Sequence, residues 1–396
     1  MQTEMQIGYC GNVHPGRTIA EVKQNLELHS LDVKSRVRDN EPMGIGLWLS
    51  ATASKELDSR DTSLEFRDWL QQRGLLPFTL NGFPYGDFHQ EVVKHDVYLP
   101  TWAMPERLDY TIRLAEILNL LLPDGVDGTI STLPLGWPVV DGISNVDDEL
   151  FWKSCGRNLL ACAERLDNIQ QTSGRNIFIC IEPEPGCILD TWDDVVGFFD
   201  QHLFLDSSST DLIRKHIGVC HDVCHSAVMF EEQGTAIKEY QKAGINIGKV
   251  QVSSAVAADF GSVTGDSEKQ AEMLRQLKNF AEPKYLHQTS VSSNGETMFY
   301  EDLSLALEAN PEPVGLWNVH FHVPIFSDSL ELIGTTQDQI EQCVKSIIDS
   351  GELMPHFEIE TYAWNVLPER LRDGTLAEGI AKEIQWFDGL VGRLSN

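Results

Sequence analysis

The sequence predicts a single α/β domain over residues 1–396, built as a (β/α)8 TIM barrel with insertions at the barrel mouth. Short β-rich runs alternate with helical patterns along the whole chain, and parallel strands need such a helix at each crossover. A length of 396 residues suits a barrel with insertions. No Gly-x-Gly-x-x-Gly follows the first run, which disfavours an open dinucleotide-binding sheet.

Eight β-rich runs supply the predicted barrel strands, and a helical pattern follows each of them. Thr18-x-x-Glu21 after the first run is a capping box, and Pro105 opens a helix that Pro123 closes. The runs are 7–10, 44–50, 78–84, 128–134, 176–186, 217–225, 247–254 and 356–362, and the main helices are expected near 19–26, 62–72, 105–122, 150–174, 191–199, 226–244, 336–350 and 368–394.

A ninth β-rich run, WNVHFHVP at 317–324, has no place in an eight-stranded barrel. It falls inside a long insertion, about 256–330, between the seventh and eighth strands. We therefore expect this run to form a loop at the barrel mouth, with two short helices at 268–281 and 300–308 earlier in the insertion.

The net charge and the cysteine content restrict the kinds of partner and the location that we expect for the protein. The formal charge is -30, from 30 Lys and Arg against 60 Asp and Glu, so the chain repels phosphate backbones and anionic lipid heads. We expect no nucleic-acid partner. Eight cysteines without a C-x-x-C pair, and an N-terminus without a basic and apolar leader, predict a cytoplasmic protein with no membrane insertion. A homodimer stays open.

Acidic and imidazole side chains gather where the predicted strands end, which is where catalytic groups of such barrels lie. Buried carboxylates are costly unless they are paired or bound to metal. A divalent metal ion is the simplest neutraliser of this set, with Mn, Zn, Fe, Co or Mg as candidates. The residues are Glu182 and Glu184, Asp222 and His225, His320 and His322, and Glu358 and Glu360.

Plainer interpretations compete with this one. A lone strand histidine is more often a hydrogen-bonded core residue than a ligand, so the metal hypothesis depends on the set as a whole. His14, His89 and His287 lie near turns, and either structural or substrate-contact roles fit them. Trp364 could pack in the core or wall a pocket.

Several long motifs resemble the EboE family of "metabolite traffic" proteins, within the xylose-isomerase-like barrel superfamily that includes sugar epimerases. They are GYCGNVHPG, NGFPYGDFH, STLPLG, IEPEPGC, HDVCHSAV, KVQVSSA, YLHQ, HFHVP and ETYAWNVLP, spread from residue 8 to residue 368. The superfamily pattern of a Glu, an Asp-x-x-His turn and a final Glu matches Glu182, Asp222 with His225, and Glu360. The resemblance also implies partners encoded in the same gene cluster.

One position departs from that pattern. Gln251 stands where the epimerases carry a metal-binding histidine on the seventh strand. Either His320 or His322 replaces the missing imidazole from the insertion, or metal affinity is reduced. The expected metal ligands are therefore Glu182, Asp222, His320, His322, Glu360 and Gln251.

The leading hypothesis is a divalent-metal-dependent isomerase or epimerase for a small hydroxylated metabolite, associated with trafficking or export of a secondary metabolite. Glu182 and Glu360 would move a proton next to a carbonyl, and Lys249 would stabilise the developing charge. One alternative is a barrel that binds or hands over a metabolite without chemistry, and another is a metal-dependent phosphoesterase. The expected substrate contacts are His225, Glu184, His14, Asn81, His89 and Trp364.

Overall fold

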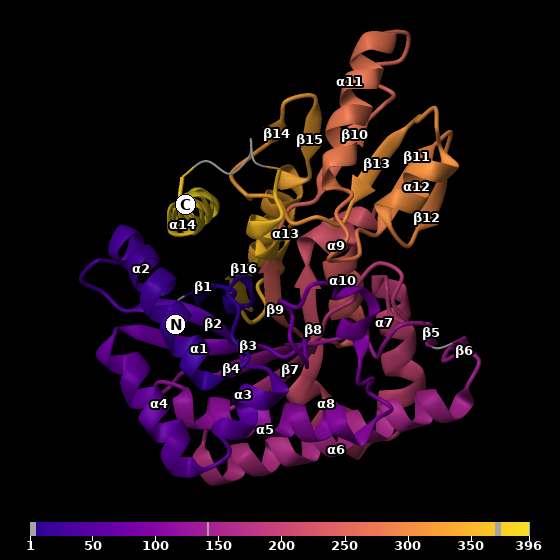
Figure 1. Cartoon of the computed structure of the whole chain (residues 1–396). Helices are drawn as coiled ribbons and strands as arrows, with labels where there is room; N and C mark the ends of the chain where they lie inside the picture. Colours follow the sequence, from indigo (N-terminus) through magenta and orange to yellow (C-terminus); the bar gives the residue numbers. More distant parts are fainter. Residues whose placement is uncertain (1–4, 141, 369–373, 396) are drawn as a thin grey trace.

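Eight parallel strands form the central barrel of this computed structural model, which describes residues 5–140, 142–368 and 374–395 (Figure 1). The strands follow one another around the barrel in chain order, and β16 returns to pair with β1. A bridge between Cys10 and Gly46 joins the remaining seam. The predicted fold is confirmed. The barrel strands are β1 (Ile7–Tyr9), β2 (Met43–Trp48), β3 (Leu75–Asn81), β4 (Gly128–Thr132), β7 (Ile177–Ile181), β8 (Ile217–Asp222), β9 (Ile247–Val252) and β16 (His356–Ile359).

Helices separate the strands and cover the outside of the barrel (Figure 1). The Thr18 hydroxyl accepts from Glu21 N at the start of α1, and Pro105 is the first residue of α5. Part of the last predicted helix, 369–373, lies outside the described residues. The helices are α1 (Ile19–Asn25), α2 (Leu31–Val37), α3 (Ala51–Glu56), α4 (Arg60–Gln72), α5 (Pro105–Leu121), α6 (Glu149–Ser173), α7 (Trp192–Phe198), α8 (Ser207–His216), α9 (Val223–Val228), α10 (Gln233–Ala243), α13 (Gln337–Ser350) and α14 (Leu376–Leu394).

A second, antiparallel sheet of six strands is built from the segment between β9 and α13. The expectation of a loop for the run 317–324 is wrong in its first half, because Leu316–Val319 forms a strand, β13, that pairs with both β10 and β11. His320 and His322 follow directly after this strand. The sheet holds β10 (Val256–Asp259), β11 (Thr289–Ser293), β12 (Glu296–Tyr300), β13, β14 (Ser329–Leu330) and β15 (Ile333–Thr335), with α11 (Ser267–Leu277) and α12 (Leu303–Ala309) alongside; β5 (Val139–Val140) and β6 (Ile143–Ser144) form a separate pair.

Charged side chains fill part of the barrel interior. Lys249 Nζ lies 2.6 Å from Glu358 Oε2, and both side chains are fully buried. Lys249 Nζ also donates to Ser131 Oγ over 3.2 Å. A Cβ on Gly46 would overlap Glu358 Oε1, so only glycine lets β2 approach this carboxylate. We call Lys249 and Glu358 the interior ion pair.

The register of the neighbouring strands β8, β9 and β16 places further polar residues between the interior ion pair and the barrel mouth. Gln251 is the partner of Asp222 on β8 and of Glu358 on β16. Because alternate residues of a strand face the same side, Gln251 lies one step above Lys249, and Glu360 one step above Glu358. The strands thus direct polar groups toward one end. Among the described residues, no helix combines the length and the apolar character that a membrane span requires.

Candidate active site and metal centre

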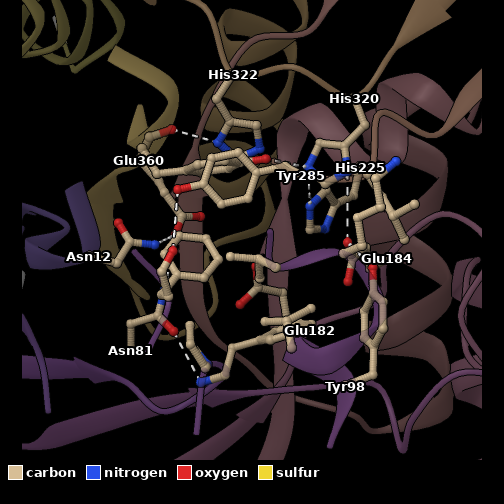
Figure 2. A pocket seen from close by; sticks show the side chains of 18 residues that line it. Asn12, Asn81, Tyr98, Glu182, Glu184, His225, Tyr285, His320, His322 and Glu360 are labelled. Carbon is tan, nitrogen blue, oxygen red and sulfur yellow. Dashed lines mark hydrogen bonds and ion pairs between the residues drawn. The ribbon is translucent and has the colours of Figure 1, made fainter. Parts of the chain in front are cut away.

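A pocket opens where the barrel strands end, under loops and the second sheet, and it encloses about 540 Å³ of space that is partly open to solvent. Figure 2 shows Asn12, Asn81 and Glu360 on one side, His225, His320 and Glu184 on the other, and Glu182 between them. The rest of the wall is largely apolar and aromatic. It includes Phe83, Pro84, Phe88, Val93, Val97, Tyr98, Tyr285, Leu286 and Tyr362.

Three carboxylates converge at the pocket. One oxygen each of Glu182, Asp222 and Glu360 lies within 4.8 Å of the other two, and all three residues are buried. Glu182 Oε2 and Asp222 Oδ2 have no hydrogen-bond partner. Burial raises the pKa of Glu182, and the neighbouring carboxylates of Glu360 and Asp222 raise it further. Such crowding of like charges calls for protons or a cation.

Glu360 is held by two amides. Asn12 Nδ2 and Asn81 Nδ2 donate to its Oε1 atom over 2.6 and 3.0 Å, which leaves Oε2 free to face the pocket. Burial and the Asp222 carboxylate raise the pKa of Glu360 to about 8, although the hydrogen bond from Asn12 opposes this rise. Without a cation, Glu360 therefore holds a proton at neutral pH.

Asp222 and His225 are placed by the start of a helix. Asp222 Oδ1 accepts from His225 N over 2.9 Å as the N-cap of α9, and from Ser253 Oγ over 2.7 Å. One turn into the helix, His225 Nδ1 donates to the Pro183 carbonyl over 2.8 Å. Burial raises the pKa of Asp222, but His225 and His322 outweigh it and bring the pKa below its usual value.

His322 is oriented as a ligand. Its Nδ1 atom lies 2.7 Å from the Glu360 carbonyl oxygen, and since a carbonyl can only accept, Nδ1 must donate and carries the ring proton. In the neutral ring, Nε2 therefore carries the lone pair. This Nε2 has no hydrogen-bond partner and lies 3.9 Å from Asp222 Oδ2. Burial lowers the pKa of His322 to about 4, which keeps the ring neutral. A backbone carbonyl on the far nitrogen is typical of metal-binding histidines.

Glu184 belongs to a separate network on the opposite wall. Its Oε1 atom accepts from Tyr98 Oη over 2.9 Å and from Gln288 Nε2 over 3.0 Å. The oxygen of the Gln288 amide then faces His320 Nδ1 at 2.7 Å, so His320 donates there. Glu184 is thus supplied with donors and orients His320 through Gln288.

Two of the predicted site residues lie deeper than expected. Lys249 does not line the pocket, because its ammonium is paired with Glu358 in the interior. Burial lowers the pKa of Lys249, but the Glu358 carboxylate outweighs this and holds the pKa above its usual value. Gln251 is fully buried, and neither atom of its amide has a hydrogen-bond partner.

Three predicted substrate contacts do not line the pocket either. His14 lies against Tyr9 and stacks on His29. His89 Nε2 donates to the Asn12 carbonyl over 2.7 Å, so His89 supports a pocket residue from behind. Trp364 Nε1 reaches Glu383 Oε2 at 3.4 Å, away from the cavity. His225, Glu184 and Asn81 do line it.

Several residues that line the pocket were not predicted from the sequence, among them Asn12, Tyr98, Tyr285 and Tyr362. Asn12 lies three residues after the end of the first barrel strand, in the short 3-10 helix Gly11–Val13, and its closeness to the strand end was the available signal. Tyr98 and Tyr285 come from irregular segments in which neither periodicity nor spacing marks a site. Tyr362 follows the last barrel strand, inside a motif in which only Glu360 and Trp364 were singled out.

The donor set fits a divalent cation. The unpartnered buried atoms of Glu182, Asp222, His322 and Gln251 are all ligand types, and mixed carboxylate and imidazole sets suit transition metals. No protein cation is free to neutralise them in the described pocket, because Lys94, which lines it, is paired with Asp302 at 2.8 Å. The cluster can therefore hold an ion and, in its absence, protons.

No family model matches the chain, and no curated protein matches its sequence. Among solved structures, a D-tagatose 3-epimerase-like protein is similar in fold, with a TM-score of 0.53 and 12% identity over 99% of this chain and 98% of that one. A xylose isomerase-like TIM barrel protein from Mycobacterium smegmatis, solved in complex with magnesium, gives a TM-score of 0.51 and 10% identity over 99% and 98%. The chain thus has the fold of the xylose-isomerase-like TIM barrels.

Proposed function

We propose that the chain is a divalent-metal-dependent isomerase or epimerase that acts on a small hydroxylated metabolite. The convergence of Glu182, Asp222 and Glu360, with unpartnered buried oxygens and no free cation beside them, carries this proposal. The ion would be held by these three carboxylates and His322. When bound, a divalent ion polarises a substrate carbonyl and the hydroxyl next to it.

The protein's own residues would move the proton. Glu182 lies between the two sides of the pocket, and burial raises its pKa, so its carboxylate can accept a proton from a carbon next to a carbonyl. Glu360 Oε2 faces the same space, and the amides of Asn12 and Asn81 fix the orientation of its carboxylate. Two such groups allow removal of a proton at one position and its return at another.

The test is exchange of substrate hydrogen with solvent. Metal-loaded protein is incubated in heavy water with a panel of ketoses and other small polyhydroxy ketones, and NMR follows deuterium at the carbon next to the carbonyl. We expect exchange with at least one compound, and its loss in Glu182→Gln and Glu360→Gln. Glu149→Gln is the matched control, because Glu149 is an exposed glutamate on the outer helix α6. Full exchange in both site variants would contradict the proposal.

A non-catalytic barrel that binds or hands over a metabolite is the second candidate. Gln251 favours it, because a neutral amide stands where the resemblance expects a metal-binding imidazole. In that case metal-free protein would bind a ligand as tightly as loaded protein. The finer hypotheses, of EboE-type metabolite traffic, cytoplasmic location and partners from one gene cluster, stay predictions of the sequence.

A further inference from the structure

Part of the pocket surface is built from rings and aliphatic side chains, in contrast to the carboxylates and histidines beside them. We call this part the apolar wall; it comprises Phe88, Val97, Tyr98, Tyr285, Leu286 and Tyr362. Phe88, Tyr285 and Tyr362 contact one another, with ring centroids between 5.1 and 5.6 Å apart. The rings of Tyr98 and Tyr285 border the same cavity as Glu182 (Figure 2).

The hydroxyl groups of the apolar wall already have partners within the protein. Tyr98 Oη donates to Glu184 Oε1 over 2.9 Å, and Tyr285 Oη donates to the Phe88 carbonyl over 3.3 Å. Tyr362 Oη lies 3.5 Å from His320 Nε2. The wall therefore presents mainly ring and aliphatic carbon to a ligand. A ligand hydroxyl placed against it would lose its bonds to water without a replacement, which is unfavourable.

The pocket also lacks a partner for a negatively charged substituent. Among the described residues that line it, Lys94 is the one lysine or arginine, and its ammonium lies 2.8 Å from Asp302 Oδ2. The Asp302 side chain is only 8% exposed, so a ligand that drew Lys94 away would leave a largely buried carboxylate unpaired. Glu182 and Glu360 face the same space and repel an anion.

Backbone pairing holds the apolar wall in place. Val93 N donates to the Lys284 carbonyl over 2.8 Å, which joins the segment of Phe88 and Val97 to that of Tyr285 and Leu286. A ligand therefore meets a wall that is already assembled, and little ordering is needed on binding. The pocket encloses about 540 Å³, which falls in the range of about 300–1,000 Å³ for sites that bury ligands larger than a three-carbon unit.

We propose that the substrate carries an uncharged ring, aromatic or alicyclic, next to its carbonyl and hydroxyl groups, in place of the hydroxyl chain or the phosphate of a sugar. The proposal rests on the proposed function for the reacting end of the substrate. That end faces Glu182 and Glu360, and the ring lies against Phe88, Tyr285 and Leu286. Burial of the ring provides affinity, because removal of apolar and aromatic area from water is favourable.

Three hydroxyketones that share one reacting end test the substituent. 2-Hydroxyacetophenone carries a phenyl group, hydroxyacetone a methyl group and dihydroxyacetone phosphate a phosphate. NMR titration of the full chain, stripped of metal with a chelator so that no ion holds the phosphate, measures the three dissociation constants. We expect the phenyl compound to bind about ten- to a hundredfold more tightly than the methyl compound, and the phosphate compound to bind most weakly. Equal affinity for phenyl and methyl, or tightest binding of the phosphate, would overturn the proposal.

Variants of the apolar wall locate the ring. Leu286→Asn and Val97→Asn each place an amide in the wall and should lower the ratio of phenyl to methyl affinity by about tenfold. Leu286→Met, which keeps an apolar side chain of similar size, should retain the ratio. Leu353→Asn is the matched control, because Leu353 is an exposed leucine outside the pocket. Circular dichroism checks that each variant is folded, and an unchanged ratio in both folded pocket variants would contradict the placement of the ring.

Deuterium exchange distinguishes a failure of this proposal from a failure of the proposed function. In heavy water, protein loaded with Mn²⁺ should exchange the hydrogens on the hydroxyl-bearing carbon of 2-hydroxyacetophenone. Tight binding of the phenyl compound without exchange would support the ring preference and count against the proposed function. Exchange of ketoses together with equal phenyl and methyl affinity would support the proposed function and overturn the ring preference.

Discussion

The interior ion pair (Lys249 and Glu358) and the carboxylate cluster (Glu182, Asp222 and Glu360) both bury carboxylates, and the chain at and just after β16 contributes one to each, yet only the ion pair holds its own cation. Glu358 faces Lys249 at 2.6 Å, and both side chains are fully buried. Two residues further along the chain, Glu360 meets Asp222 and Glu182, and Lys249 lowers the pKa values of Glu360 and Glu182 less than burial and the neighbouring carboxylates raise them. A buried carboxylate that is paired with a lysine of the same chain has a structural role, whereas a cluster of buried carboxylates without such a partner is a candidate cation-binding site.

The largest effect is expected from breaking the interior ion pair. Lys249→Met leaves Glu358 buried and unpaired, which should lower the free energy of unfolding by about 3–5 kcal/mol, measured by urea denaturation. The double variant Lys249→Met with Glu358→Gln removes both charges and should recover most of the loss. If Lys249 were instead a catalytic group, the single variant would keep its stability and lose activity.

A substitution in the carboxylate cluster should have little effect on the free energy of unfolding, in contrast to one in the interior ion pair. Glu360→Gln in stripped protein should change stability little, because Glu360, with a pKa of about 8, is already protonated at neutral pH. In the wild type, Mn²⁺ at a hundredfold excess over its dissociation constant should add about 2.7 kcal/mol. Thermal unfolding with and without Mn²⁺ measures the effect of the substitution and the stabilisation by the ion. If Mn²⁺ stabilised Glu360→Gln as much as the wild type, Glu360 would not be a metal ligand.

Metal binding should depend on pH in a direction that the pKa of Glu360 sets. Because that pKa is raised to about 8, the proton must leave before the carboxylate binds an ion, so affinity is greatest above pH 8 and falls as the pH drops below it. We expect a loss of up to about tenfold per pH unit between pH 7.5 and 6. Calorimetry in buffers of different ionisation enthalpy should detect the released proton, whereas no release would mean that Glu360 is not a ligand.

The smallest effect is expected from the residues that orient Glu360. Asn12→Ala removes one of two donors to its Oε1 atom, which should weaken Mn²⁺ binding by about 1 kcal/mol, or several-fold. The loss should shrink at high pH, because that hydrogen bond lowers the pKa of Glu360. A loss that is constant from pH 6 to pH 9 would indicate a packing defect instead.

Much of the fold and part of the site could be predicted from the sequence. Alternation of β-rich runs and helices identifies the barrel, and in a barrel the ends of the strands meet; this brings Glu182, Asp222 and Glu360 together. The place of His225 beside Asp222 could be predicted from the Asp-x-x-His spacing, because the side chain of an N-cap residue accepts from the backbone N–H three residues later and so holds that residue close. These inferences need only local periodicity and one topological rule.

Lys249 and Trp364 illustrate what the same reasoning could not decide. Strand alternation assigns the Lys249 side chain to the barrel interior. Whether it contacts a substrate or Glu358 depends on how far it lies from the barrel mouth, which the sequence does not give. Trp364 lies in a matching motif, yet its ring turns toward Glu383 on α14. The run at 317–324 is β-rich, but its partners β10 and β11 lie far from it in the chain, so the local pattern could not assign it to a second sheet.

The sequence alone thus determined the barrel and the residue types at its mouth, because hydrophobic periodicity and strand order are properties of neighbouring residues. Tertiary structure decided which charges are neutralised and which nitrogens face inward. Lys249 reaches Glu358 across the register of two strands, and His320 and His322 reach the pocket from a sheet inserted after the seventh strand. Electrostatic pairing depends on distances of a few ångströms between residues that are distant in the chain, and only the folded barrel sets those distances.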